Sequence, residues 1–293
     1  MPVLVRALVR LAFAASVAIA AALAWGSPVP AQVQRVSVDV EATYRRQPTL
    51  MDTALSSLQP AEEGPRQLFF VGFAGFGPEA VFKREVLAVR ELFDQRFGTR
   101  GRSVALINHA STVGQLPLAS VANLERVLGH VGAIMDKGRD TLFLFLTSHG
   151  ERGVFIIDMP GFDLGQLTPG RLKRMLDASG IKNRVIVVSA CHSGSFLQPL
   201  AGPTTLVMTA ARADRTSFGC DDQREWTYFG DAYFNRALRE ETSFTRAFER
   251  AKVTIGQWEA RERLRPSHPQ IGGGQALPAI DWPAAGRRRD TLH

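Results

Sequence analysis

Short apolar runs alternate with longer segments of mixed polarity along the chain between residues 68 and 263. The run at 141–147 reads Thr-Leu-Phe-Leu-Phe-Leu-Thr, and its interior is apolar without alternation, as expected of a strand that helices cover on both faces. This succession is typical of βαβ units and predicts an α/β domain with a parallel sheet. The other strands are predicted at 68–73, 103–107, 184–189 and 205–209.

The segments between these runs carry apolar residues at spacings of three and four, which is the pattern of amphipathic helices. Residues 79–97 show one such stripe, and Gly98 is expected to end the helix. Thr168-Pro169 is a helix-start signal, because threonine caps a first turn and proline fits the first helical position. Further helices are predicted at 121–135, 231–239 and 244–263, and a small hairpin at 154–157.

The first 31 residues have the layout of a secretory signal peptide. Arg6 and Arg10 precede an apolar run over 11–25, and Val29-Pro30-Ala31 ends in a small residue. The run is shorter than the roughly 20 residues that cross a bilayer comfortably, so we expect cleavage after Ala31 and export to the periplasm or the medium. An uncleaved inner-membrane anchor is the alternative, and it is the only membrane contact that we expect.

The remainder of the chain divides into three parts. Residues 32–66 are polar and contain several prolines, so they are expected to form a lead-in with at most one short helix around 50–58. Residues 67–275 are expected to form one domain, and residues 276–293 a flexible basic tail.

The formal net charge is +7, but no interleaved aromatic residues accompany it, so we do not expect a nucleic-acid partner.

Reactive side chains follow two of the predicted strands. The strand at 141–147 leads into Ser148-His149-Gly150, and the strand at 184–189 leads into Ala190-Cys191-His192. Ligands bind at the carboxyl edge of a parallel sheet, because the βα loops gather there. If the two strands are neighbours, His149 and Cys191 meet at that edge.

A cysteine and a histidine so placed predict nucleophilic catalysis. A free thiol has a pKa of about 8.5, so a cysteine nucleophile needs a nearby imidazole or helix N-terminus. His149 would take the thiol proton and return a proton to the leaving amine, while the amides of Gly150 and Cys191 would bind the oxyanion. Cys191 and Cys220 could instead pair in an oxidising compartment, and this alternative stays open. No metal or cofactor is expected, since the chain has no zinc-like spacing of Cys and His.

Both motifs resemble those of a known family. Leu-Thr-Ser-His-Gly and Ser-Ala-Cys-His-Ser-Gly are similar to the two catalytic motifs of the legumain-like cysteine proteases, members of the caspase-fold clan. A third block, 216–220 and 227–231, is similar to the family's Ser-Tyr-x-Cys and Thr-Tyr-x-Gly-Asp stretches. The resemblance covers about residues 67–240. It implies a caspase-like three-layer α/β domain with a mostly parallel central sheet flanked by helices.

The resemblance also implies roles for individual residues. Cys191 and His149 would be the catalytic dyad, with Gly150 in the oxyanion site. Ser217 and Asp231 would line the pocket for the side chain before the cleaved bond. Ser189 would belong to the same pocket, but eukaryotic members have an acidic residue there that helps to select asparagine, so a preference for asparagine is not expected.

A second departure concerns the histidine. Family members carry an asparagine after the first strand that orients it, whereas the corresponding loop here reads Phe73-Ala74-Gly75-Phe76-Gly77. We therefore expect another group to orient His149.

The function predicted from these observations is that of a cysteine endopeptidase acting on protein or peptide substrates through a Cys191 acyl-enzyme. Two alternatives remain open: a transpeptidase or transamidase that uses the same dyad, and a catalytically silent scaffold that binds peptides. The sequence does not indicate the natural substrate, the activation step or the oligomeric state.

Overall fold

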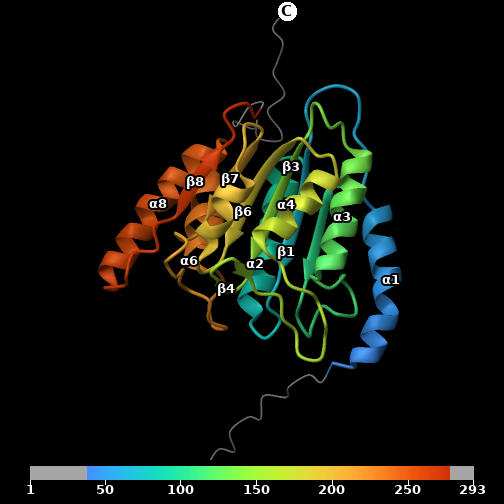
Figure 1. Ribbon diagram of the computed structural model, residues 1–293, viewed down its shortest axis with the longest axis horizontal. Coiled ribbons are helices and arrows are strands. Elements are labelled where there is room, and N and C mark those ends of the chain that lie inside the picture. The colour runs from blue at the N-terminus through green and yellow to red at the C-terminus, as the bar shows by residue number, and fades with distance from the viewer. Residues whose placement is uncertain (1–37, 278–293) are drawn as a thin grey trace, which may run out of the picture. The chain divides into compact units, whose positions relative to one another are not determined.

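In the computed structural model, which describes residues 38–277, a six-stranded sheet has the order β2-β1-β3-β6-β7-β8 (Figure 1). The first five of these strands pair in parallel, and β8 pairs antiparallel with β7. The segment expected to be a signal, 1–31, and most of the expected tail lie outside the described residues. The strands are β1 (Leu68–Ala74), β2 (Ser103–Ile107), β3 (Thr141–Thr147), β6 (Asn183–Ser189), β7 (Thr205–Thr209) and β8 (Gln270–Gly273).

All five strands predicted for the sheet are present, within one residue at each end. The sequence did not predict β8, because two of its four residues are glycine and the segment has no apolar pattern. A two-stranded hairpin, β4 (Gly150–Glu151) with β5 (Val154–Phe155), follows β3 and begins earlier than expected. It lies directly after His149.

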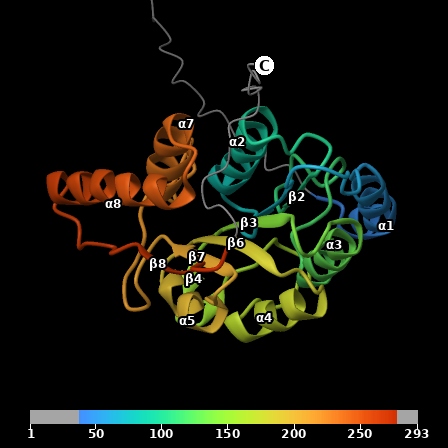
Figure 2. The ribbon, with the colours of Figure 1, turned by 90° about the horizontal axis from the view of Figure 1, so that it is seen from above.

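Helices cover both faces of the sheet, as Figure 2 shows from above. The resulting three-layer arrangement with a mostly parallel sheet confirms the predicted fold class. Thr168 caps its helix as predicted, with its side chain accepting from the N–H of Arg171 at 3.3 Å. One face carries α2 (Ala80–Arg96), α6 (Tyr228–Gly230), the π-helical η2 (Asp231–Ala237), α7 (Leu238–Glu240) and α8 (Phe244–Arg261), and the other α3 (Val121–Ile134), α4 (Pro169–Ala178) and α5 (Leu197–Leu200).

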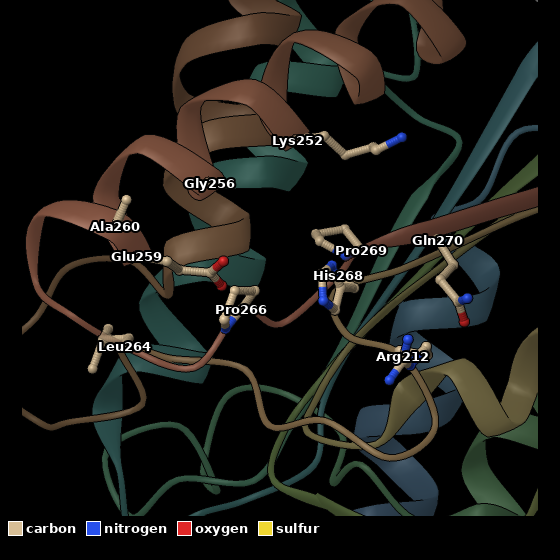
Figure 3. Close-up of a pocket in the computed structure, with 10 residues that line it drawn as sticks. All are labelled: Arg212, Lys252, Gly256, Glu259, Ala260, Leu264, Pro266, His268, Pro269 and Gln270. Carbon is tan, nitrogen blue, oxygen red and sulfur yellow. The ribbon is translucent and has the colours of Figure 1, made fainter.

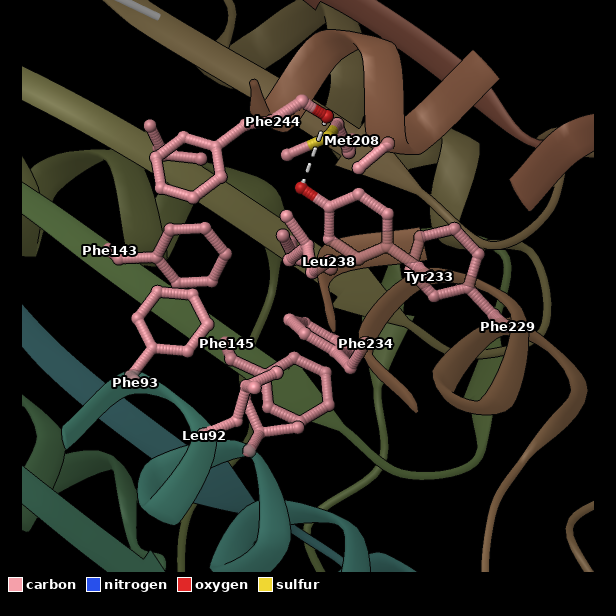
Figure 4. Packing of buried hydrophobic residues seen from close by; sticks show 14 of the residues in the cluster. Leu92, Phe93, Phe143, Phe145, Met208, Phe229, Tyr233, Phe234, Leu238 and Phe244 are labelled. Carbon is pink, nitrogen blue, oxygen red and sulfur yellow. Dashed lines mark hydrogen bonds between the residues drawn. The ribbon is translucent and has the colours of Figure 1, made fainter. Parts of the chain in front are cut away.

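The alternation of side chains along β3 builds the two halves of the core. Phe143 and Phe145 point to the α2 and α8 side, where Phe93, Phe234 and Phe244 pack against them (Figure 4). The leucines at 142, 144 and 146 belong to the cluster under α3 and α4. Because both faces of this strand are buried, its sequence shows no polar alternation.

The N-terminal helix is longer than the sequence predicted. In place of a short helix around 50–58, α1 spans Val40–Ser56, with Asp39 accepting a cap bond from Ala42 at 2.9 Å. Pro48 lies inside the helix, where proline costs about 3 kcal/mol because it cannot donate to the preceding turn. Burial of Met51 and Leu55 in the cluster under α3 offsets this cost, so these residues are part of the α/β core.

Candidate active site

The candidate site lies at the carboxyl edge of the sheet, where β3 and β6 end side by side. The strands pair in parallel with Thr147 opposite Ser189, and the N–H of Ser148 donates to the carbonyl of Ser189 at 3.1 Å. His149 and Cys191 each follow two residues beyond this paired position. The structure therefore brings them to the same edge of the sheet.

The two loops that leave these strands are in contact through Gly150. A Cβ atom added to Gly150 would lie 2.3 Å from the carbonyl oxygen of Cys191, so a larger residue would force the loops apart. The hairpin after Gly150 holds this segment, with the N–H of Ile156 donating to the carbonyl of His149 at 3.1 Å. The oxyanion role of the Gly150 and Cys191 amides stays a prediction.

Two aromatic rings and a carboxylate surround the His149 imidazole. Phe76 and Phe82 pack nearly perpendicular to it, with ring centroids at 4.6 Å and 5.2 Å. The Nε2 atom of His149 lies 3.0 Å from Oε2 of Glu79, the residue that precedes α2. An ionised carboxylate can only accept, so Nε2 carries the hydrogen in this contact. Nδ1 is then the nitrogen left for proton exchange.

The sulfur of Cys191 is half-buried against Ser217. The N–H of Ser217 donates to Sγ at 3.2 Å, and Sγ lies 3.6 Å from the carbonyl of Ser217. Burial raises the pKa of the Cys191 thiol, while the backbone N–H groups of Ser217 and Cys191 act in the opposite direction. The isolated thiol therefore stays protonated near neutral pH, and a base must remove its proton.

The turn after the cysteine is held by His192. This residue has a left-handed backbone with φ of 57°, its N–H donates to the carbonyl of Arg215 at 2.8 Å, and its Nδ1 lies 3.0 Å from the carbonyl of Ala213. The helical segment that follows, η1 (Ser193–Phe196), is a single short turn. His192 thus bonds through both its backbone and its ring to the segment 213–215, which leads to Ser217. The role of His149 as the base stays a prediction.

Ser189 and Asp231 lie differently from Ser217. Ser189 is buried at the end of β6, with its Oγ 3.4 Å from Oγ1 of Thr227. The carboxylate of Asp231 accepts from Nδ2 of Asn235 at 2.8 Å and forms an ion pair with Arg236 at 3.2 Å. Of these three described residues, Ser217 is the one that bonds the Cys191 sulfur, and the pocket roles of all three stay predictions.

A buried carboxyl lies beneath the site. Glu85 of α2 accepts from Oγ1 of Thr147 at 2.6 Å, and from the N–H and Oγ1 of Thr227 at 3.1 Å and 2.7 Å. Burial raises its pKa from 4.5 to about 7, and these hydrogen bonds oppose the rise. Glu85 thus links the end of β3, which leads to His149, to the segment 227–231 of the third motif.

Both cysteines are free thiols in the structure. Cys220 packs against the cluster under α2 and α8, and burial raises its pKa strongly, with Cys191 and Glu85 adding to the effect. A thiol held so firmly in its protonated form is a poor nucleophile. Cys220 is therefore poorly suited to be a nucleophile.

Over residues 38–277 no cluster of three His, Cys, Asp or Glu side chains could hold a metal ion. No helix in that range is both long and apolar enough to span a bilayer.

A cavity of about 510 Å³ lies between α8 and the segment 264–270, lined by Arg212, Lys252 and His268 among others (Figure 3). Its lining includes neither Cys191 nor His149.

Fold and site together define a caspase-like α/β domain with a cysteine and a histidine at the carboxyl edge of its sheet. The chain is similar in structure to caspase-1 from Spodoptera frugiperda, with a TM-score of 0.50 over 74% of this chain and 97% of the caspase chain. Sequence identity in this comparison is 10%, so the likeness concerns the fold alone.

The sequence comparisons give the family. The model of the peptidase C13 family matches residues 119–272, more than half of the chain, and the chain belongs to this family of cysteine-type peptidases. It is 28% identical to legumain from Mus musculus over 105 residues and 28% identical to legumain from Bos taurus over 106 residues. Each match covers 35% of this chain and 24% of the legumain, so it spans about a quarter of those relatives.

Sequence reasoning missed two acidic residues of the site. Glu79 lies 70 positions before its partner His149, and only the packing of α2 on the sheet joins them. The position of Glu85 could have been noticed in the sequence. It lies three residues after Phe82 and four before Val89, on the apolar stripe of its helix. A charged residue at such a position indicates a buried, hydrogen-bonded group.

Proposed function

We propose that this chain is a cysteine endopeptidase in which Cys191 is the nucleophile and His149 the general base and acid. The observation that carries this proposal is the register of β3 and β6, which sets both residues at one edge of the sheet with Gly150 against the Cys191 carbonyl. Membership of the peptidase C13 family supports the same reaction class.

The proposed reaction begins with transfer of the Cys191 proton to Nδ1 of His149. The sulfur then attacks the peptide carbonyl carbon, and the amides of Gly150 and Cys191 stabilise the oxyanion. As the tetrahedral intermediate collapses, the C–N bond breaks, and His149 returns the proton to the leaving amine. Water, deprotonated by His149, hydrolyses the thioester, which releases the acid and restores the thiol.

A thiol-reactive peptidyl probe tests the dyad directly. Labelling of Cys191 is expected in the wild type and to fall by about 10²- to 10⁴-fold in His149→Ala, because the general base is lost. His109→Ala is a matched control, since His109 follows β2 at the same edge but bonds Ser111 at 2.8 Å. Its labelling should stay within about twofold of the wild type. Equal labelling of the wild type and His149→Ala would refute the dyad.

Product analysis separates the alternatives. Peptides from a library should be cut to a free acid and a free amine, as mass spectrometry would record. Ligated products in the presence of a second amine would identify the chain as a transpeptidase, because the amine then replaces water at the thioester. A folded chain that binds peptides without labelling or cleavage would be the silent scaffold.

We also propose that the protein acts after export, on protein or peptide substrates outside the cytoplasm. The charge and apolar pattern of residues 1–31 supports this. Fractionation of the producing cells and N-terminal sequencing of the recovered protein would test it. A new N-terminus at Gln32 is the expected result, and an intact N-terminus in the membrane fraction would instead indicate an anchor.

A further inference from the structure

Glu79 is positioned to orient the imidazole of His149. Its Oε2 lies 3.0 Å from Nε2, and 27% and 34% of the two side chains are exposed, for Glu79 and His149 respectively. Phe76 and Phe82 pack on the ring and hold it in place. The contact therefore lies at the edge of water, where a charge-assisted hydrogen bond is stronger than in bulk solvent.

The carboxylate of Glu79 does not serve as a cap for α2. Glu79 precedes α2 but makes no side-chain cap bond. The N–H of Ala80 donates instead to Oδ1 of Asp222 at 2.7 Å. The start of α2 thus has two carboxylates, one that bonds the helix backbone and one that bonds the histidine.

We propose that Glu79 is a positioning residue that completes a Cys191–His149–Glu79 triad. By accepting the hydrogen of Nε2, it fixes the tautomer in which Nδ1 has a free lone pair for the Cys191 proton. After that proton moves, the imidazolium carries hydrogen on both nitrogens, and the Glu79 carboxylate stabilises its positive charge while remaining ionised. The loop after β1 has no amide side chain that could orient His149. Glu79 takes this role instead. This inference rests on the proposed function.

The triad predicts how the reactivity of Cys191 depends on pH. Glu79 favours the thiolate–imidazolium pair, so removing its charge should slow alkylation of Cys191 at neutral and acidic pH. At alkaline pH the thiolate forms without the imidazolium, and the effect should disappear. A purely structural role would lower the rate equally at every pH. Titratable and charged groups near Glu79 in the described chain include Lys83, Arg84 and Glu85 on α2, His109 after β2, Cys220, Asp221 and Asp222 in the facing loop, and Asp158 beside Phe76.

The experiment measures alkylation of Cys191 in the full chain by iodoacetamide, from about pH 5 to about pH 10, with the modified residue identified by peptide mapping. Glu79→Gln keeps a hydrogen-bond acceptor but removes the charge, and Glu79→Ala removes both. We expect Glu79→Gln to react about tenfold more slowly than the wild type near pH 6, the effect of one charge-assisted hydrogen bond, and Glu79→Ala more slowly still. The curves of the wild type and Glu79→Gln should converge near pH 10.

Asp222→Asn is the matched control, because it changes the other carboxylate at the start of α2 and leaves the histidine contact intact. Its curve should follow that of the wild type within about twofold. If the Glu79→Gln curve coincides with that of the wild type while His149→Ala is slow, the triad is wrong and the dyad stands. If His149→Ala also coincides with the wild type, the proposed function itself fails.

Discussion

At the residue scale, Glu85 is a carboxyl whose acidity folding changes strongly. Its side chain is fully buried, and its partners are the hydroxyl groups of Thr147 and Thr227 and one backbone N–H. Asp231 adds a further unfavourable negative charge nearby. No cation among residues 38–277 forms an ion pair with it, so burial shifts the carboxyl toward its protonated form in the folded chain.

This shift predicts a pH-dependent stability. Because the pKa rises from 4.5 to about 7, the folded chain binds the Glu85 proton more tightly than the unfolded chain does. The stabilising contribution is therefore complete below about pH 4.5 and is lost as the pH rises to about 7, an effect of about 3 kcal/mol. Glu85→Gln has the same shape and no charge, so the variant should lose this dependence. Urea unfolding at about pH 5 and pH 7.5 measures the difference.

Glu91→Gln is the control for this measurement, since Glu91 is exposed on the same helix and bonds only Gln95 in the described part of the chain. It should keep the wild-type difference between the two pH values. The assignment to Glu85 would be contradicted by a Glu85→Gln variant that still loses as much stability as the wild type when the pH is raised.

At the scale of elements, two glycines three residues apart on α3 differ in what surrounds them. A Cβ atom on Gly132 would lie 2.2 Å from the carbonyl oxygen of Ser179, the residue that ends α4. A Cβ atom on Gly129 would meet nothing within 4 Å. The first glycine thus permits the close approach of α3 and the end of α4, and the second has no such role.

Opposite effects are expected when each glycine is replaced by alanine. Gly132→Ala should destabilise the domain by about 1–3 kcal/mol, because backbone must move to make room. Gly129→Ala should stabilise it by about 0.5–1 kcal/mol, because alanine favours the helix and restricts the unfolded chain. Chemical denaturation of both variants measures the two effects, and a stabilising Gly132→Ala would contradict the packing described for α3.

Elements buried on both faces were the ones that the sequence predicted well. The continuous apolar run at 141–147 avoids water only when helices cover both faces of the sheet. Its strand begins and ends where expected. The order of strands then brought His149 and Cys191 to one edge. β8 could not be predicted, because its place depends on the edge that β7 offers and not on its own residues. The Glu79 contact was equally hidden, since it depends on where the start of α2 meets a loop 70 residues later.

At the scale of the whole molecule, the position of α1 extends the domain toward the N-terminus. Met51 is 1% exposed and belongs to the same cluster as Leu124, Leu128 and Val131 of α3. The side of α1 that faces water carries charged residues such as Asp52, which pairs with Arg126 of α3. A segment that looked polar in sequence is therefore amphipathic in the fold, and it contributes to the core under the sheet.

If α1 belongs to the cooperative core, a cavity beneath it should weaken the entire domain. We expect Met51→Ala to lower the free energy of unfolding by about 2–5 kcal/mol, because it removes buried methylene and thioether contacts and leaves a void. The exposed neighbour Thr53 is the control, and Thr53→Ala should change stability by no more than about 0.5 kcal/mol. Urea unfolding followed by circular dichroism and by native-state hydrogen exchange of the β3 amides would measure both variants. Protection of β3 should fall with the global stability in Met51→Ala; if only the α1 amides lose protection, the helix unfolds on its own and the domain does not depend on it.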